Sequence, residues 1–161
     1  MIDVNIDEAY PQHAAVIDYH TTIDEMGTQM GTAIGELLGT LRSAHVEPEG
    51  MPFSMYPELE PDDDGVWHVI TGFPVHDSVP ELGRVTNFDV PGGLVAKAIH
   101  IGPYDTLHET YVELEEAVRD KGYIPDGPVR ECYLTSPDME PDASKWRTEI
   151  LMPITERELV A

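Results

Sequence analysis

The chain repeats itself once at a spacing of about 80 residues, and this repeat limits the fold more than any other feature of the sequence. The matches are Gly50-x5-Tyr56 with Gly127-x5-Tyr133, Glu60-Pro61-Asp62 with Glu140-Pro141-Asp142, segment 67–75 with segment 146–154, and His20 and Thr22 with His100 and Gly102. Four matches in the same order exceed what chance gives. We therefore predict one domain over residues 1–161 with two similar halves, at about 12–76 and 84–155.

Both halves show the same order of predicted elements. In the first half we expect strands at 14–19, 53–56 and 66–70, and a helix from the cap Thr22 to about His45. In the second half we expect strands at 94–101, 129–134 and 146–152, and a helix that begins at Gly102-Pro103 and stops at Gly122. The predicted fold is therefore α+β, made of duplicated β-α-β-β units. Antiparallel sheets would carry helices on one side about a pseudo-twofold axis, with a central ligand pocket where the halves meet.

Charge and composition exclude several classes of function. The 31 Asp and Glu residues against nine Lys and Arg give a formal net charge of −22, which repels phosphate backbones and argues against direct nucleic-acid binding. No apolar run approaches the roughly 18 residues needed to cross a bilayer, and no signal-peptide pattern is visible, so we expect no membrane partner. The single cysteine, Cys132, cannot form an internal disulfide, and together these features favour the cytoplasm. The seven histidines lack ligand spacing and no phosphate-binding loop is present, so neither a metal nor a cofactor is expected.

Four glycines recur every fourth residue along the first predicted helix. Gly27, Gly31, Gly35 and Gly39 each cost up to about 1 kcal/mol in helix propensity relative to alanine, which suggests a use. We expect the stripe to allow close packing against the sheet, the second helix or a partner subunit. A homodimer or another protein partner is therefore a further option.

The second half resembles a known family. The residues that carry the resemblance are His100-x-Gly102-Pro103-Tyr104, Tyr111-x-x-Leu114, Gly122-Tyr123, Gly127-Pro128-x-x-Glu131-x-Tyr133 and Thr148-Glu149-Ile150-x-x-Pro153-Ile154. They are similar to the GyrI-like small-molecule-binding superfamily, which includes effector-binding domains of multidrug-responsive regulators and the DNA gyrase inhibitory protein. The resemblance implies two β-α-β-β units around an aromatic-lined pocket, with a glutamate on the last strand that Glu149 matches. The sequence departs from the family at Ala117, where a tryptophan is frequent, and leaves no room for a helix-turn-helix before Ala14.

Glu149 is the leading candidate for binding chemistry. Alternation along its strand places it with Arg147 and Leu151, and a carboxylate there faces either water or the pocket. The resemblance favours the pocket, where a dry carboxylate beside aromatic rings would suit a planar cation. The remaining candidates for ligand binding are Tyr104, Tyr111, Glu131, Tyr133, Trp146, Leu151, Phe53, Tyr56 and Trp67. Ordinary core packing is the alternative for each aromatic residue, and a structural hydrogen bond is the plain explanation for His100.

Three functions remain open. The preferred one is a stand-alone sensor or sequestering protein that binds small amphipathic, cationic organic molecules. The second is a hydrolase of reactive cyclopropane-type compounds, which the resemblance suggests, with Glu149 as general base and Tyr104 or Tyr133 as orienting group. The third is an acidic protein-interaction inhibitor that resembles the gyrase inhibitory protein.

Overall fold

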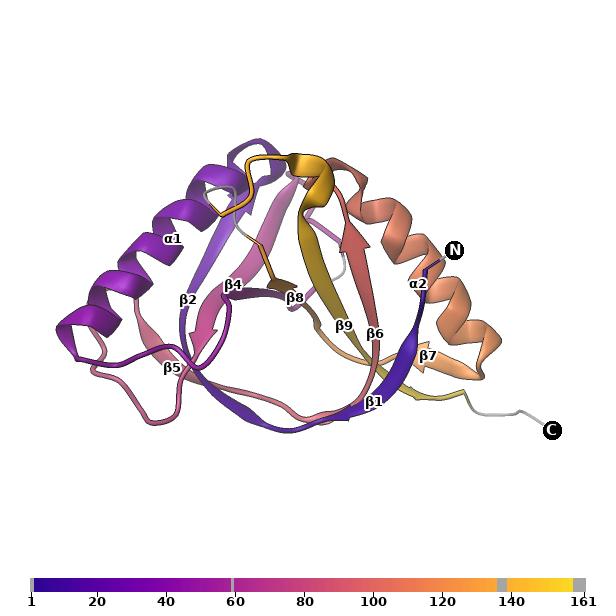
Figure 1. The fold of residues 1–161 in the computed structure, drawn as a ribbon, viewed down its shortest axis with the longest axis horizontal. Coiled ribbons are helices and arrows are strands. Elements are labelled where there is room, and N and C mark those ends of the chain that lie inside the picture. The colour runs from indigo at the N-terminus through magenta and orange to yellow at the C-terminus, as the bar shows by residue number, and fades with distance from the viewer. Residues whose placement is uncertain (1, 59, 136–138, 158–161) are drawn as a thin grey trace. The chain divides into compact units, whose positions relative to one another are not determined.

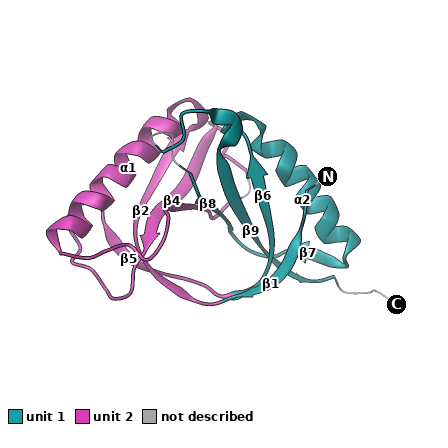
Figure 2. Cartoon of the chain, viewed as in Figure 1, with its two compact units in different colours: residues 1–9, 93–161 teal, residues 10–92 magenta. Residues whose placement is uncertain are grey.

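The computed structural model describes residues 2–58, 60–135 and 139–157, and the chain divides into two compact units (Figures 1 and 2). Unit 2 consists of residues 10–92, and unit 1 of residues 1–9 together with 93–161. The chain therefore passes between the units twice. Each unit is an antiparallel sheet with one α-helix on one face, which confirms the predicted α+β class.

Unit 2 is built from four strands and the longer helix. Its elements are β2 (Gln12–Thr22), α1 (Ile23–Ser43), β3 (Phe53–Tyr56), β4 (Val66–Pro74) and β5 (Thr86–Val90), and its strand order is β3-β4-β2-β5. One stripe of α1, formed by Ala33, Leu37 and Leu41, is buried against Ile17 and Val69 of the sheet. Because alternate strand residues face the helix, these apolar positions form the core of the unit.

Unit 1 contains the shorter helix and five strands. Its elements are β1 (Asn5–Ala9), β6 (Gly93–Ile101), the 3-10 turn η1 (Tyr104–Thr106), α2 (Leu107–Asp120), β7 (Tyr123–Pro125), β8 (Val129–Tyr133), the 3-10 turn η2 (Ala143–Lys145) and β9 (Arg147–Glu156). The strand order is β1-β6-β9-β8, and β7 pairs with the end of β9. Leu114 and Val118 of α2 pack against Ala98, Ile150 and Met152 in the core.

Three strands were not predicted, and two of them pair outside their own half of the sequence. β1 precedes the first half but pairs with β6 of unit 1, and β5 directly precedes β6 but pairs with β2 of unit 2. The bounds of the two compact units therefore differ from 12–76 and 84–155, the predicted halves of the sequence repeat. Each unit is a β-α-β-β repeat with an added edge strand, β5 in unit 2 and β1 in unit 1, and unit 1 also has the short strand β7.

The predicted match between His20 and His100 is wrong by one residue. Tyr19 pairs with Val69 and His100 pairs with Thr148, while Val69 and Thr148 are equivalent in the repeat, so Tyr19 is the counterpart of His100. His20 is exposed, whereas His100 is buried. A shift of one residue reverses the face of a strand, so the two histidines have different environments.

The helix ends follow the sequence only in part. Thr22 is the N-cap of α1 as predicted, but its side chain makes no capping hydrogen bond. The second helix does not begin at Gly102-Pro103: Gly102 has φ +125, the η1 turn follows, and α2 starts at Leu107. Gly122, with φ +89, follows the end of α2 as predicted.

The glycine stripe of α1 does not pack against the described residues of unit 2. A Cβ atom added at Gly27, Gly31, Gly35 or Gly39 would meet no atom within 4 Å. The stripe therefore does not serve close approach of the sheet of unit 2, one of the partners that the sequence left open. Among the described residues, no helix combines the length and apolar character needed to cross a membrane.

Candidate ligand-binding site

The centre of the candidate site is a buried carboxylate in unit 1. Strand alternation turns Glu131 and Tyr133 of β8 toward α2, and only 6% of Glu131 is exposed. The Tyr111 hydroxyl of α2 donates a hydrogen bond to Glu131 Oε2 at 2.5 Å, and the Tyr133 hydroxyl donates to Oε1 at 3.1 Å. Each oxygen thus accepts a phenolic O–H, an arrangement that stabilises the ionised form of a buried carboxyl group.

Aromatic rings lie beside this carboxylate. The Tyr104 ring of η1 lies edge-to-face with Tyr133, with centroids 6.0 Å apart, and tilts against Trp146 at 5.1 Å. Burial, with the charge of Glu131 as a second cause, raises the pKa of Tyr104. Tyr104 remains 39% exposed, so the cluster reaches from the buried carboxylate to the surface. The Trp146 indole N–H donates to the Glu140 carbonyl at 2.6 Å, which fixes the orientation of that ring.

His100 holds the turn that carries Tyr104. Its Nε2 lies 3.0 Å from the Pro103 carbonyl oxygen, and its Nδ1 lies 2.7 Å from the Thr110 hydroxyl. A carbonyl oxygen only accepts, so Nε2 carries the proton, and in the neutral ring Nδ1 accepts from Thr110. This confirms the structural hydrogen bond expected for His100. It ties β6 both to the residue before Tyr104 and to α2.

Glu149 and Leu151 lie on the opposite face of the same sheet. Glu149 of β9 pairs with Ile99 of β6 and Cys132 of β8, whereas Glu131 pairs with Ile150. Glu149 is partly exposed, and its charge helps raise the pKa of Cys132 to about 11, after burial as the main cause. The structure therefore brings Tyr104, Tyr111, Glu131, Tyr133 and Trp146 together and leaves Glu149 and Leu151 outside the cluster.

The first-half candidates lie in unit 2 in a different chemical setting. Tyr56 and Trp67 are edge-to-face, with centroids 6.1 Å apart, while Phe53 is buried on the other face of β3. The repeat makes Ser54 the counterpart of Glu131. Ser54 Oγ lies 2.8 Å from the Thr71 hydroxyl and also contacts the Met30 sulfur. A hydroxyl therefore replaces the carboxylate in this unit.

Other parts of the described surface offer less chemistry. One hollow lies at the end of α1, lined by residues such as Leu38 and His45, and a second lies beside Lys121 and Tyr123 after α2. Neither hollow contains a residue of the aromatic cluster. Within 2–58, 60–135 and 139–157, no group of three or more His, Cys, Asp or Glu residues is placed to hold a metal ion.

Glu131 was among the predicted ligand-binding residues, and the sequence also contains a signal for its burial. Glu131 alternates with Val129 and Tyr133, two residues that favour burial, so the carboxylate had to share their face. The supporting contacts from Thr110 and the Glu140 carbonyl had no such signal. They depend on where η1, α2 and η2 are placed in space.

The comparisons with known proteins are consistent in fold. Residues 2–155 match the family described as the GyrI-like small molecule binding domain. The crystal structure of the EcmrR C-terminal domain superposes with a TM-score of 0.85 at 21% identity, covering 97% of this chain and 99% of that chain. In the cryo-EM structure of the EcmrR–DNA complex in EcmrR-RPo, this chain spans only 58% of the EcmrR chain.

Two further solved structures are similar. The structure of SAV2435 bound to tetraphenylphosphonium has a TM-score of 0.66 at 13% identity, and the superposition covers 95% of this chain and 94% of that chain. A protein from Listeria innocua described as a hydrolase has a TM-score of 0.67 at 14% identity, and the superposition covers 94% of this chain and 91% of that chain. A sequence comparison with curated proteins found no match. At these identities the structural likeness shows the fold, and the match over nearly the whole chain shows the family. The chain belongs to the GyrI-like small molecule binding domain family.

Proposed function

We propose that unit 1 binds small amphipathic organic cations at the aromatic cluster, with Glu131 as the countercharge. The observation that carries this proposal is a carboxylate only 6% exposed, held by two tyrosine hydroxyls next to a partly exposed tyrosine ring. A carboxylate held by phenolic hydroxyls beside aromatic rings attracts a delocalised cation, which has no strongly bound water shell to lose. The faces of Tyr104 and Trp146 would add cation–π attraction of about 0.5–2 kcal/mol each.

The comparisons support the class of ligand. SAV2435, which is similar in fold, is described as bound to tetraphenylphosphonium, a bulky aromatic cation. The acidic surface of the chain, with a formal charge of −22, would also favour the approach of cations over anions. Capture of such compounds fits the sensing or sequestering role that the sequence suggested.

Two matched variants test the countercharge. Glu131→Gln keeps the shape of the side chain and removes its charge, so binding of tetraphenylphosphonium should weaken by about tenfold or more, as expected for loss of a desolvated charge contact. Glu149→Gln removes the same charge from the opposite face of the sheet and should bind like the wild type. Titration calorimetry with tetraphenylphosphonium, and with the neutral compound triphenylphosphine oxide as a second probe, measures both effects.

The two probes separate charge from shape. The neutral compound should bind wild type and Glu131→Gln alike. Unchanged tetraphenylphosphonium affinity in Glu131→Gln would contradict the proposal. Loss of affinity only in Glu149→Gln would restore the earlier hypothesis that Glu149 supplies the charge.

A hydrolase is the second candidate, because one similar structure is described as a hydrolase. In that case a glutamate would activate water, and Tyr104 or Tyr133 would orient the substrate, as the sequence suggested. Turnover of a cyclopropane-bearing electrophile by the wild type, with loss of turnover but retained binding in Glu149→Gln or Glu131→Gln, would support this function and identify the base. Absence of turnover at saturating substrate would leave binding as the function.

A further inference from the structure

Unit 2 contains a segment, residues 75–90, that closes one side of its core and that we call the strap. It links β4 to β5 and includes β5. Val75, Val79 and Val85 of the strap are buried in the core beneath α1, although the segment before β5 has no regular structure. Arg84 forms an ion pair with Glu36 of α1. The part of the strap before β5 is therefore held mainly by side-chain contacts, whereas β5 also pairs with β2 through its backbone.

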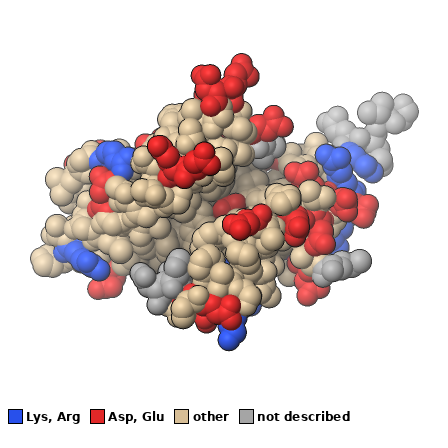
Figure 3. Space-filling view, turned by 90° about the horizontal axis from the view of Figure 1, so that it is seen from above, with Lys and Arg blue, Asp and Glu red and all other residues tan. Residues whose placement is uncertain are grey.

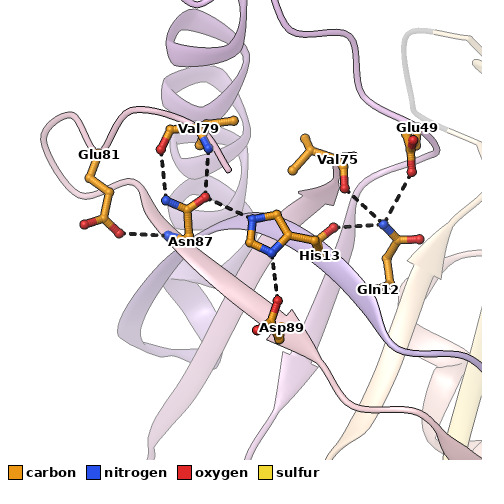
Figure 4. Close-up of polar contacts among 8 residues, drawn as sticks. All are labelled: Gln12, His13, Glu49, Val75, Val79, Glu81, Asn87 and Asp89. Atoms are coloured by element: carbon orange, nitrogen blue, oxygen red, sulfur yellow. Dashed lines mark hydrogen bonds and ion pairs between the residues drawn. The ribbon is translucent and has the colours of Figure 1, made fainter. Parts of the chain in front are cut away.

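Asn87 is fixed in the strap by the backbone of Val79 (Figure 4). The Val79 N–H donates to Asn87 Oδ1, and Asn87 Nδ2 donates to the Val79 carbonyl, both at 2.9 Å. This pair of bonds determines which atom of the amide is oxygen. The same Oδ1 lies 3.1 Å from Nε2 of His13, so the histidine faces an acceptor there.

His13 faces a second acceptor through its other ring nitrogen. Its Nδ1 lies 2.7 Å from Asp89 Oδ1, and His13 and Asp89 are directly opposite one another in the β2–β5 pairing. A neutral imidazole has one donor and one acceptor, whereas an imidazolium has two donors. Because both neighbours are acceptors, the geometry is complete only when His13 is protonated. In the neutral ring, one lone pair would face an oxygen lone pair.

The surrounding charges act in the same direction. The hydrogen bond to Asp89 is the main cause that raises the pKa of His13, with smaller contributions from Asn87 and the charges of Asp89 and Asp77, against a lowering by burial. Glu81 accepts the backbone N–H of Asn87 at 3.0 Å. On the β2 side, Gln12 contacts Glu49, which also pairs with the exposed His76 at 3.4 Å.

The pair also marks the place where the chain leaves unit 2. One passage between the units is at residues 9–10, shortly before His13, and the other is at residues 92–93, shortly after Asp89. The His13–Asp89 contact therefore joins the two connecting segments at their base. Loss of the contact would leave β5 held to β2 by backbone pairing alone at this end.

We propose that His13 is a proton-operated latch that fastens the strap and β5 to β2. The latch is closed while His13 is protonated and opens when it loses the proton. A group whose pKa is raised by folding contributes stability that is complete below its unfolded pKa and is lost as the pH rises through its folded pKa. The strap should therefore loosen above neutral pH. This inference concerns unit 2 and does not depend on ligand binding at Glu131.

Nuclear magnetic resonance of the intact chain tests the latch without any substitution. Ring-nitrogen shifts should show both nitrogens of His13 protonated at pH 6, with a midpoint above about 6.5, the ordinary value for histidine. Hydrogen-exchange protection factors of the Val79 and Asn87 amides, corrected for intrinsic exchange, should fall about threefold or more between pH 6 and pH 9, since each unit of pKa difference permits a tenfold change.

Three variants assign the effect to the latch. His13→Gln and Asp89→Asn should lower the protection factors at pH 6 and remove their dependence on pH. His76→Gln changes an exposed histidine of the same strap and should keep the wild-type response. A His13 midpoint at or below about 6.5, the ordinary value for histidine, or pH-independent protection in the wild type, would overturn the proposal. The same pH response in His13→Gln would overturn it as well.

Discussion

At the scale of single residues, register decides which of two similar glutamates meets the aromatic cluster. Glu131 and Glu149 lie on neighbouring strands of one sheet, but Glu131 pairs with Ile150 while Glu149 pairs with Cys132. Successive strand residues point to opposite faces, so the two carboxylates are separated by the sheet itself. Composition and motif make them equivalent, and only the pairing distinguishes them.

Cys132 offers a chemical readout of this separation. Burial is the main cause that raises its pKa to about 11, so at pH 8 only about one thiol in a thousand is ionised, and alkylation by iodoacetamide should be roughly 100-fold slower than for an ordinary cysteine. Glu149 raises this pKa more than Glu131 does. Glu149→Gln should therefore accelerate alkylation more than Glu131→Gln. Mass spectrometry of the alkylated chain gives both rates.

A control in urea sets the reference rate. Unfolding should restore ordinary reactivity in all variants. A native rate equal to the unfolded rate would show that Cys132 is not buried as described. A larger acceleration in Glu131→Gln would contradict the assignment of Glu149 to the face of Cys132.

At the scale of elements, the sequence predicted those helices and strands that have a clear hydrophobic periodicity. Both helices and the strands buried on their helix-facing side were found, because apolar residues recur along them with the period of the element. β1 and β5 escaped prediction because they are short edge strands in which polar residues such as Asp7 and Asp89 are exposed. Their pairing partners lie about 80 residues away, and local sequence carries no record of them. Pro103 marked a turn rather than the first turn of α2.

The exposed glycines of α1 lead to a prediction about helix stability. A Cβ at Gly31 or Gly35 would meet nothing within 4 Å, so alanine costs no contact there and gains helix propensity. Gly31→Ala and Gly35→Ala should each raise the free energy of unfolding by up to about 1 kcal/mol. Urea denaturation followed by circular dichroism measures the change. Gly72→Ala is the matched control, because its Cβ would lie 2.5 Å from the Ala15 carbonyl oxygen and must destabilise the sheet.

The same variants examine the other use of the stripe. If the glycines are covered by a second copy of the chain, alanine should weaken self-association, and the concentration dependence of sedimentation should move to a higher concentration range. A monomer that gains stability from each alanine would show that the stripe is a solvent-exposed helix face.

At the scale of the whole molecule, the unequal numbers of charges are the dominant feature. Acidic residues are spread over the face seen in Figure 3, and basic residues are few there. Ion pairs such as Lys97–Asp7 and Arg84–Glu36 use part of the small set of nine Lys and Arg, which leaves most of the 31 carboxylates without a cationic partner by number alone. The sequence predicted this imbalance, the family and the aromatic members of the candidate site. It did not predict the face of Glu149, which depends on pairing across three strands.

This imbalance predicts that salt stabilises the protein. Like charges repel one another more strongly in the compact state than in the expanded chain, and added salt shortens the range of that repulsion to about 10 Å at 0.1 M. Raising NaCl from 20 mM to 500 mM should therefore raise Tm by several degrees, with about 2–4 °C for each kcal/mol in a chain of this size.

Asp63→Asn combined with Asp64→Asn, which removes two exposed charges, should raise Tm at low salt and reduce the increase in Tm that NaCl causes. Differential scanning calorimetry at equal ionic strength in NaCl and in tetramethylammonium chloride distinguishes screening, which depends only on ionic strength, from binding of Na⁺. A fall in Tm with NaCl would mean that the few ion pairs outweigh the repulsion among the carboxylates.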